Sequence, residues 1–477
     1  MTSMTAEASF GVEEHHLQAL LGEGLRRARR QRRPVLVSIV RRVPWSDPLE
    51  FFERGAVVAD DRLFWSCPSE GYAMAGVGAA WTLSVKGTRR FADAATAWRD
   101  CCIDALIDGE ANIVGTGPVL MGGFAFDPLR RSTALWAGYP DGLLILPQYV
   151  LTTVDGVAWL TVNALLSPDR ELAAEVQAIT GVRGWGMGNG APAPHPQPPT
   201  ADSLCVEDVL PATEWEAIVR TLVEDLRCGD LEKVVLAREC RVSGRHPFAP
   251  SRVLSRLRAD YPGCFVFAVA RGSRCFLGAS PERLARLRHG TVWATCLAGS
   301  IARGATAEED RRLGEALLTS AKDQAEHAVV VRALRDALAG ACTELAVASE
   351  PTLLKLHNVQ HLFTPVVGRV ADERTILDFV ERLHPTPAVG GYPRETALRL
   401  IREREGMDRG LYAGPIGWMD ARGDGEFAVA IRSALLRGTE ASLFAGCGIV
   451  AGSEPENEYA ESCLKLRPIL STLRRGA

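Results

Sequence analysis

The sequence predicts an α+β fold, and three observations support that prediction. Apolar, strand-like runs such as PVLVSIV and GLLILPQYVL dominate the first half of the chain. In the second half, blocks of strands and amphipathic helices follow one another without the regular alternation of a parallel α/β sheet. The 477 residues are 47% hydrophobic and 23% charged, which is ordinary for a globular protein with a large core.

The first half begins with a helix and continues as strands. We expect the helix over residues 12–31, ending in RRARRQRR, where positive charge suits the negative end of the helix dipole. A polyanion-binding patch is the alternative interpretation of these arginines. Segment 184–203 is rich in Gly and Pro and is the best candidate boundary. It divides the chain into an N-terminal part, residues 1–203, and a C-terminal region, residues 204–477.

The second half carries sharper signals. A helix is predicted over TEWEAIVRTLVEDLRCGD, with a capping box at Thr213 and Glu216. A strand over EKVVLARECRVSG and a meander of strands with turns at Gly272 and Gly290 follow. One long helix or two consecutive helices come next, with a capping signal at Ser320. Strands return at GEFAVAIRSALL and ASLFAGCGIVAG before a closing helix.

The composition argues against several classes of protein. The net charge of −4 argues against a protein that binds nucleic acid through its overall charge. No apolar run approaches the roughly 18–20 residues that span a bilayer, and the first residues lack the pattern of a secretion signal. Twelve scattered cysteines without a CxxC pair indicate reduced thiols, not disulfides or zinc. We therefore expect a cytoplasmic protein without nucleic-acid or membrane partners.

The stretch SEPENEYAES, which directly follows a strand-like run, concentrates negative charge. Ser453 and Glu456 fit a capping box at the start of the closing helix. Glu458 and Glu461 lie deeper and share a helix face with Lys465. A solvated row of ion pairs explains that face, but the glycines of the preceding GCG indicate that a ligand or backbone comes close. The pattern leaves open a surface row of charges or a cation site.

A second acidic pair, Asp323 and Glu326, also lies three residues apart on a predicted helix. Carboxylates from two helices could meet at a hard cation, and oxygen ligands would suit Mg²⁺. His357 and His361 have the spacing of a zinc-binding helix but lack the Glu of HExxH, which argues against zinc.

Lys233 and Glu282 are the candidates for acid–base chemistry. Lys233 precedes the apolar strand VVLAR and is either a solvated strand-edge residue or a buried base with a lowered pKa. Glu282 follows Pro281 and is either a turn residue or a general acid with a raised pKa. The chain has no GxSxG or Walker A motif, and GVGAAW lacks the context of a dinucleotide loop.

Nine stretches in order resemble the chorismate-binding enzymes, and among these the isochorismate synthases: KVVLAR, LGASPERL, LAGSIARG, KDQAEH, VQHLFTPVVG, HPTPAVGGYP, RGLYAGPIGW, FAVAIRSALL and GCGIVAGSEPENEYAESCLKL. They span residues 210–468, and GGFAFDP adds a match in the first half. The resemblance implies a large α+β fold with antiparallel sheets in a sandwich, helices outside and both halves interwoven. It makes residues 204–477 the chorismate-binding catalytic region and lowers the weight of a domain boundary at 184–203.

The resemblance also implies the reaction, a reversible, Mg²⁺-dependent isomerisation of chorismate to isochorismate. Water adds at C2 of the ring and the C4 hydroxyl leaves. Lys233 would be the base that activates the water, and Glu282 the acid that protonates the departing hydroxyl. The implied metal ligands are Glu326 and Glu461, with Glu458 and Asp323 acting through water. The implied substrate-binding residues are Gly299, His361, Ala388, Tyr412, Arg432, Gly446 and Lys465.

Relatives within the family have other products. Ammonia-using members lack a lysine at the position of Lys233, so the presence of Lys233 argues against them. No glutamine amidotransferase subunit is therefore expected. Another type has a nucleophilic lysine where this chain has Ala298. Salicylate synthases go on to eliminate pyruvate, and they tend to have Thr where this chain has Ala388. Ala388 thus favours a reaction that stops at isochorismate, and salicylate synthase remains the alternative. A non-catalytic chorismate-binding regulator would be expected to have lost Lys233, Glu282 or a metal ligand. The pathway, whether menaquinone, siderophore or other, and the choice between monomer and homodimer stay open.

Overall fold

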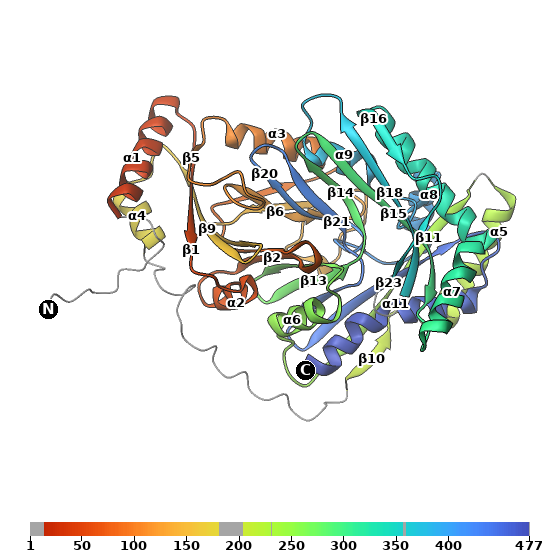
Figure 1. The fold of residues 1–477 in the computed structure, drawn as a ribbon. Coiled ribbons are helices and arrows are strands. Elements are labelled where there is room, and N and C mark those ends of the chain that lie inside the picture. The colour runs from red at the N-terminus through yellow and green to blue at the C-terminus, as the bar shows by residue number, and fades with distance from the viewer. Residues whose placement is uncertain (1–13, 181–203, 230, 356–358, 477) are drawn as a thin grey trace.

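The computed structural model describes residues 14–180, 204–229, 231–355 and 359–476, and its strands form two large sheets (Figure 1). The described strands number thirteen in one sheet and ten in the other. Neighbouring strands are antiparallel in every described pair except the short β1–β5 pair. The predicted α+β class with antiparallel sheets is confirmed.

Both halves of the chain contribute strands to each sheet, the C-terminal region at one end and the N-terminal part at the other. The first sheet has the order β10 (Cys205–Asp208), β11 (Lys233–Ser243), β23 (Glu440–Ile449), β22 (Ser433–Arg437), β13 (Arg274–Ser280), β12 (Phe265–Arg271), β2 (Asp61–Cys67), β3 (Tyr72–Val77), β8 (Tyr149–Val154), β9 (Val157–Leu166), β1 (Val35–Val43) and β5 (Leu106–Asp108), with β19 (Gly391–Tyr392) also paired to β11. The second has the order β16 (Cys342–Val347), β18 (Val359–Val370), β15 (Thr291–Ala302), β14 (Arg283–Arg288), β21 (Gly425–Val429), β20 (Pro415–Asp420), β6 (Val119–Phe124), β7 (Gly142–Leu146) and β4 (Trp81–Val85), with β17 (Thr352–Lys355) also paired to β18.

Two strand pairs join the halves directly. Strand β12 pairs with β2 in the first sheet, and β20 pairs with β6 in the second. The halves are therefore interwoven, as predicted. Segment 184–203, the candidate boundary, lies outside the described residues.

The main core lies between the two sheets. It includes Trp65 and Phe276 from the first sheet and Phe124 and Phe427 from the second, all at most 2% exposed. Burying one such side chain stabilises the fold by about 1.5–3 kcal/mol. Strand residues with alternating or wholly apolar patterns thus hold the two sheets face to face.

Helices cover the outer faces of the sandwich (Figure 1). Those on the first sheet are α1 (Glu14–Gln31), α2 (Pro48–Arg54), α4 (Leu172–Thr180), α6 (Pro250–Asp260) and α11 (Pro455–Gly476). Those beside the second sheet are α3 (Arg90–Cys102), α7 (Ala307–Thr319), α8 (Ala321–Ala339) and α9 (Ile376–Leu383). Helices α5 (Ala212–Cys228) and α10 (Arg394–Arg404) pack on β11, and short 3₁₀ turns lie at η1 (Gly55–Val57), η2 (Pro68–Glu70) and η3 (Ala134–Trp136).

Some predicted boundaries are confirmed and others are wrong. The predicted helix pair breaks at Ser320, whose hydroxyl accepts a bond from the Asp323 backbone N–H at 3.3 Å. The capping box predicted at Thr213 is wrong, because α5 begins at Ala212 and the carbonyl of Pro211 accepts its first backbone bonds. The single strand predicted over GEFAVAIRSALL is two strands, β21 and β22, since the chain turns at residues 430–432.

The arginines at the end of α1 are largely engaged within the protein. Arg26 and Arg27 bind Glu23 one helical turn away, and Arg29 donates to the carbonyl of Pro168. These contacts favour the structural interpretation of RRARRQRR over a polyanion patch. Within the described residues, none of the helices combines the length and the apolar character needed to cross a bilayer.

Candidate active site

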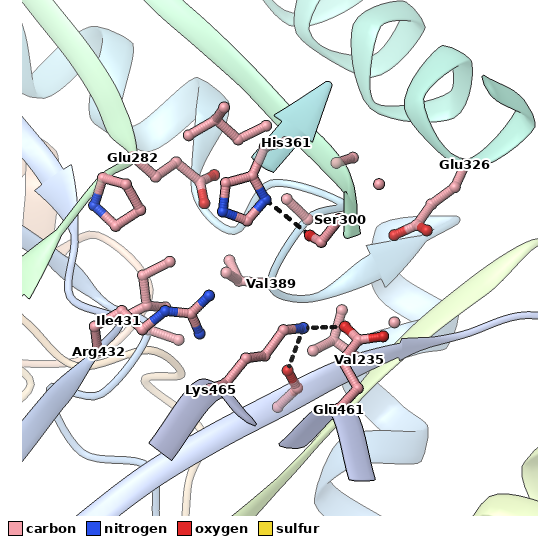
Figure 2. A pocket seen from close by; sticks show the side chains of 18 of the residues that line it. Val235, Glu282, Ser300, Glu326, His361, Val389, Ile431, Arg432, Glu461 and Lys465 are labelled. Atoms are coloured by element: carbon pink, nitrogen blue, oxygen red, sulfur yellow. Dashed lines mark hydrogen bonds and ion pairs between the residues drawn. The ribbon is translucent and has the colours of Figure 1, made fainter. Parts of the chain in front are cut away.

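A cavity of about 960 Å³, its open mouth included, lies where β11, β15, β18 and β23 meet α8 and α11 (Figure 2). Every site residue predicted from the sequence lines this cavity: Lys233, Glu282, Gly299, Asp323, Glu326, His361, Ala388, Tyr412, Arg432, Gly446, Glu458, Glu461 and Lys465. These residues come from segments more than two hundred positions apart, and only the two-sheet topology brings them together. Their individual roles stay predictions.

Lys233, the first residue of β11, is buried with 1% of its surface exposed. Its Nζ donates to Glu326 Oε1 on α8 at 2.7 Å. Strand β23 passes next to β11, and a Cβ on Gly448 would lie 2.6 Å from Lys233 Cε and 3.0 Å from Glu326 Oε1. The solvated strand-edge interpretation of Lys233 is therefore wrong, and the glycine leaves room for this ion pair.

Glu282 stands between β13 and β14 and is 4% exposed. Burial raises its pKa to about 7, although Lys233, Arg432 and the Thr386 hydroxyl favour the charged form. A carboxyl with a pKa near the working pH can both give and regain a proton, which is what a general acid needs.

This raised pKa has a consequence for stability. An unfolded glutamate has a pKa near 4.5, so between pH 4.5 and about 7 the folded chain holds a proton that the unfolded chain has lost. Folding stability from this group therefore falls as pH rises through that window, by about 3 kcal/mol in total. The free energy of unfolding of Glu282→Gln, measured with denaturant, should therefore rise by that amount relative to the wild type between pH 4.5 and 8. The exposed Glu440→Gln is the control, and a pH-independent gain in Glu282→Gln would contradict this account.

The acidic stretch SEPENEYAES, which runs into α11, does not form the predicted capping box. Ser453 precedes the helix, and its hydroxyl donates to Glu458 Oε1 at 2.6 Å while accepting from the backbone N–H of Val450 at 3.1 Å. Glu456 points outward, with its carboxylate 3.8 Å from Arg220. The box of Ser453 with Glu456 is therefore wrong, because the serine orients a buried carboxylate instead.

Three glutamates on two helices make an oxygen-rich wall. Each is matched by a lysine in this structure, and the three pairs are Glu326–Lys233 at 2.7 Å, Glu458–Lys322 at 3.6 Å and Glu461–Lys465 at 2.6 Å. Carboxylate oxygens suit a hard divalent ion such as Mg²⁺. The row of surface ion pairs is thus wrong as an explanation for Glu458, which is 4% exposed.

One soft ligand atom lies beside these carboxylates. Cys447 Sγ falls within 4.8 Å of ligand atoms of Glu458 and Glu461. Its thiol donates to the Glu458 backbone carbonyl at 3.1 Å, and burial raises the pKa of Cys447 well above its usual range. The donors here that suit a hard ion are the carboxylates, since a soft sulfur suits other metals. Asp323, the other predicted ligand, contacts Ser320 and lines the same cavity.

Positive charge and hydrogen-bond donors also line the cavity. The Arg432 guanidinium points into it (Figure 2), and within the described residues it makes no hydrogen bond or ion pair. Tyr412 stacks on Phe444 at 5.2 Å, and burial raises the pKa of Tyr412 to about 12, so its hydroxyl stays a donor. Lys465 donates to the Gly446 carbonyl at 3.0 Å as well as to Glu461. These three residues offer donors and positive charge to an anionic ligand.

Sequence reasoning missed a buried pair behind this wall. Arg409 lines the cavity and binds Glu405, and it donates to the carbonyls of Val235 at 2.8 Å and Val389 at 2.9 Å. Glu405 in turn accepts from the backbone N–H of Ala237 at 2.8 Å. The pair thereby ties β11 to the loop that carries Val389. The i, i+4 spacing was visible in the sequence, but such charge pairs usually lie on a helix surface.

Comparisons with known proteins agree with this geometry. Residues 23–474 match the family model described as chorismate binding enzyme. Isochorismate synthase MenF of Bacillus subtilis is 37% identical over 475 residues, covering 98% of each chain. A salicylate biosynthesis isochorismate synthase of Pseudomonas aeruginosa is 41% identical over 469 residues, covering 96% of this chain and 94% of that one.

Solved structures show the same fold. The menaquinone-specific isochorismate synthase MenF of Escherichia coli matches with a TM-score of 0.75 at 25% identity, covering 96% of this chain and 99% of that one. Anthranilate synthase component I of Streptococcus pneumoniae shares the fold with a TM-score of 0.68 at 23% identity, covering 83% of this chain and 92% of that one. The chain therefore belongs to the family of chorismate-binding enzymes.

Proposed function

We propose that this chain is an isochorismate synthase, an isomerase that converts chorismate reversibly into isochorismate. The observation that carries the proposal is a buried lysine and a buried glutamate with a pKa near 7, Lys233 and Glu282, lining one cavity. Relatives that cover nearly the whole chain are named isochorismate synthases, which supports the same activity. We further propose that the enzyme acts in the cytoplasm without a glutamine amidotransferase subunit, as a monomer or homodimer.

The proposed reaction needs one base and one acid. Lys233, as its neutral amine, accepts a proton from the water whose oxygen bonds to C2 of the ring. The ring double bonds shift, the bond from C4 to its hydroxyl oxygen breaks, and Glu282 gives its proton to that oxygen, so that water leaves. In the reverse direction the two residues exchange roles. A glutamate with a pKa near 7 can take up a new proton at neutral pH after it has given one away.

Binding of the dianionic substrate follows from the charges on the cavity walls. We propose that Arg432 and Tyr412 hold the enolpyruvyl carboxylate, since the guanidinium has no ion-pair partner within the described residues. Mg²⁺ would be held by Glu326 and Glu461, with Glu458 and Asp323 acting through water. When bound, the ion supplies positive charge that grips the ring carboxylate and offsets repulsion between neighbouring anions.

Ser453→Ala should weaken Mg²⁺ binding by about 10-fold, because the partners that orient a metal's carboxylates typically contribute 10–100-fold in affinity. Isothermal titration of the purified protein with Mg²⁺ measures this without turnover. Ser471, on the same helix, donates only to the carbonyl of Pro468, so Ser471→Ala is the matched control. Equal Mg²⁺ affinity in Ser453→Ala and the wild type would show that the serine does not position Glu458.

The activity itself is tested with purified protein and chorismate, with and without Mg²⁺, and chromatography of the products. We expect isochorismate to form only with Mg²⁺. Salicylate and pyruvate, formed faster than by spontaneous breakdown, would instead identify a salicylate synthase and overturn the inference from Ala388. Tight chorismate binding without turnover would identify a regulator.

A further inference from the structure

A groove of about 900 Å³, its open mouth included, adjoins the active-site cavity. The residues that line both spaces are labelled in Figure 2 and show that the two are joined: Ser300, Arg432, Glu461 and Lys465. One wall of the groove is formed by the end of β15 and the start of β18, where Ala302 lies opposite Val359. The other wall is formed by α11.

The wall on α11 comes from one face of that helix. Leu464, Lys465 and Pro468 follow Glu461 at the helical spacings of i+3, i+4 and i+7, which put side chains on one face. Leu464 keeps 42% of its surface exposed, although it is a large apolar side chain. The groove is therefore partly apolar and open to solvent.

Cations outnumber anions along the groove. The charged residues that line it are one carboxylate and four cations: Glu461, Arg303, Arg432, Lys465 and Arg467. Glu461 binds Lys465 at 2.6 Å, and Arg303 binds Asp310 at 2.5 Å. Within the part of the chain that the structure describes, Arg432 and Arg467 have no ion-pair partner. The uncompensated charge of the groove therefore lies on these two arginines.

The two arginines lie at different depths. Arg467 is exposed on α11 and does not line the active-site cavity, whereas Arg432 lines both spaces. The whole chain carries a net charge of −4, which repels a dianion at long range. A local excess of positive charge in a cleft can overcome such repulsion and raise association rates by about 10- to 10³-fold.

We propose that this groove is the entry route of the dianionic substrate and that Arg467 steers the substrate toward Arg432. The assignment rests on the proposed function for the identity of the dianion, but association can be measured without turnover. Arg467 acts before the substrate reaches the cavity. Its charge should therefore set the rate of association and leave kcat unchanged, since charges at the rim of a binding site mainly affect association and its salt dependence.

Reversing the charge with Arg467→Glu tests the steering role. We expect association of chorismate with the full chain, followed by stopped-flow tryptophan fluorescence, to slow about 10-fold at low ionic strength. The difference should vanish as salt is raised to about 1 M, where the Debye length is about 3 Å. In steady-state assays kcat/KM should fall in parallel while kcat stays unchanged. Arg467→Gln should show a smaller effect of the same kind.

The matched control is Arg42→Glu, which changes the net charge of the chain by the same amount. Arg42 is exposed on β1, which lies near one edge of the first sheet, whereas β11 and β23 lie near the other. Association no slower in Arg467→Glu than in Arg42→Glu at low salt would overturn the steering role. A loss that persisted at high salt would also overturn it, because it would indicate direct contact with the bound substrate.

Ala302→Trp tests the route independently of charge. Ala302 is exposed and lines the groove but not the active-site cavity. A tryptophan there should slow association at every salt concentration and leave kcat unchanged. Ala346→Trp, at an exposed position of β16 that lines neither space, is the control. Unchanged association in Ala302→Trp would overturn the route. The expected association rates without isochorismate as product would support the route and contradict the proposed function alone.

Discussion

Replacing Lys233 with alanine is expected to lower kcat by about 10²–10⁴-fold, the usual contribution of a positioned general base. Lys233 is 1% exposed, lines the cavity and lies against Glu326. Lys233→Arg is the sharper variant, because arginine keeps the positive charge but cannot release its proton. We expect Lys233→Arg to be as inactive as Lys233→Ala, measured by isochorismate formation at saturating chorismate and Mg²⁺.

The control is Lys86→Ala, which removes an exposed lysine that does not line the cavity and should leave kcat unchanged. Thermal unfolding and Mg²⁺ titration of each variant separate a lost base from a collapsed site, since Glu326 loses its partner in Lys233→Ala. Substantial activity in Lys233→Arg would show that the lysine serves as a fixed positive charge and not as the base.

Replacing Glu282 with glutamine should lower kcat by a similar factor, about 10²–10⁴-fold, because the amide cannot protonate the leaving oxygen. The wild type should also lose kcat/KM as pH rises through about 7, since the acid must be protonated and its pKa lies near that value. Glu282→Gln should lack this descending limb in its residual activity. A pH series of initial rates for both proteins measures both effects.

Glu440→Gln, an exposed carboxyl on β23, provides the matched control and should keep both the rate and the pH profile. If the descending limb near pH 7 persisted in Glu282→Gln, another group would be the acid. The same variant is expected to be more stable than the wild type above pH 7, so loss of activity through unfolding is not expected.

The sequence predicted which residues line the cavity better than it predicted which of them contact one another. Strand β11, with Lys233 at its start, and the capping serine at Ser320 follow from local pattern and are confirmed. The pairing of Lys233 with Glu326 joins residues 93 positions apart, and no local period reports such a contact. Only the fold therefore shows whether each charged residue faces solvent or the cavity.

The missed features share one physical cause. In each, contacts made only in the folded chain outweigh the preference of the local sequence. Ser453 has the spacing of a helix cap, but its hydroxyl bonds Glu458 because that carboxylate is buried beside it. Arg432 lies in a sequence that looks like a single strand, yet the chain turns there with φ at +52° and aims the guanidinium into the cavity. Ser300 enters the site only through a bulge, which has no reliable signature in one sequence.

The most direct measurement of the central claim is the reaction in H₂¹⁸O, with mass spectrometry of isochorismate collected early in the reaction. Addition of water at C2 assisted by Lys233, with loss of the C4 hydroxyl assisted by Glu282, predicts isochorismate that carries one ¹⁸O in its C2 hydroxyl. Unlabelled isochorismate would mean that the hydroxyl migrates within the substrate, and it would contradict the roles proposed for both residues.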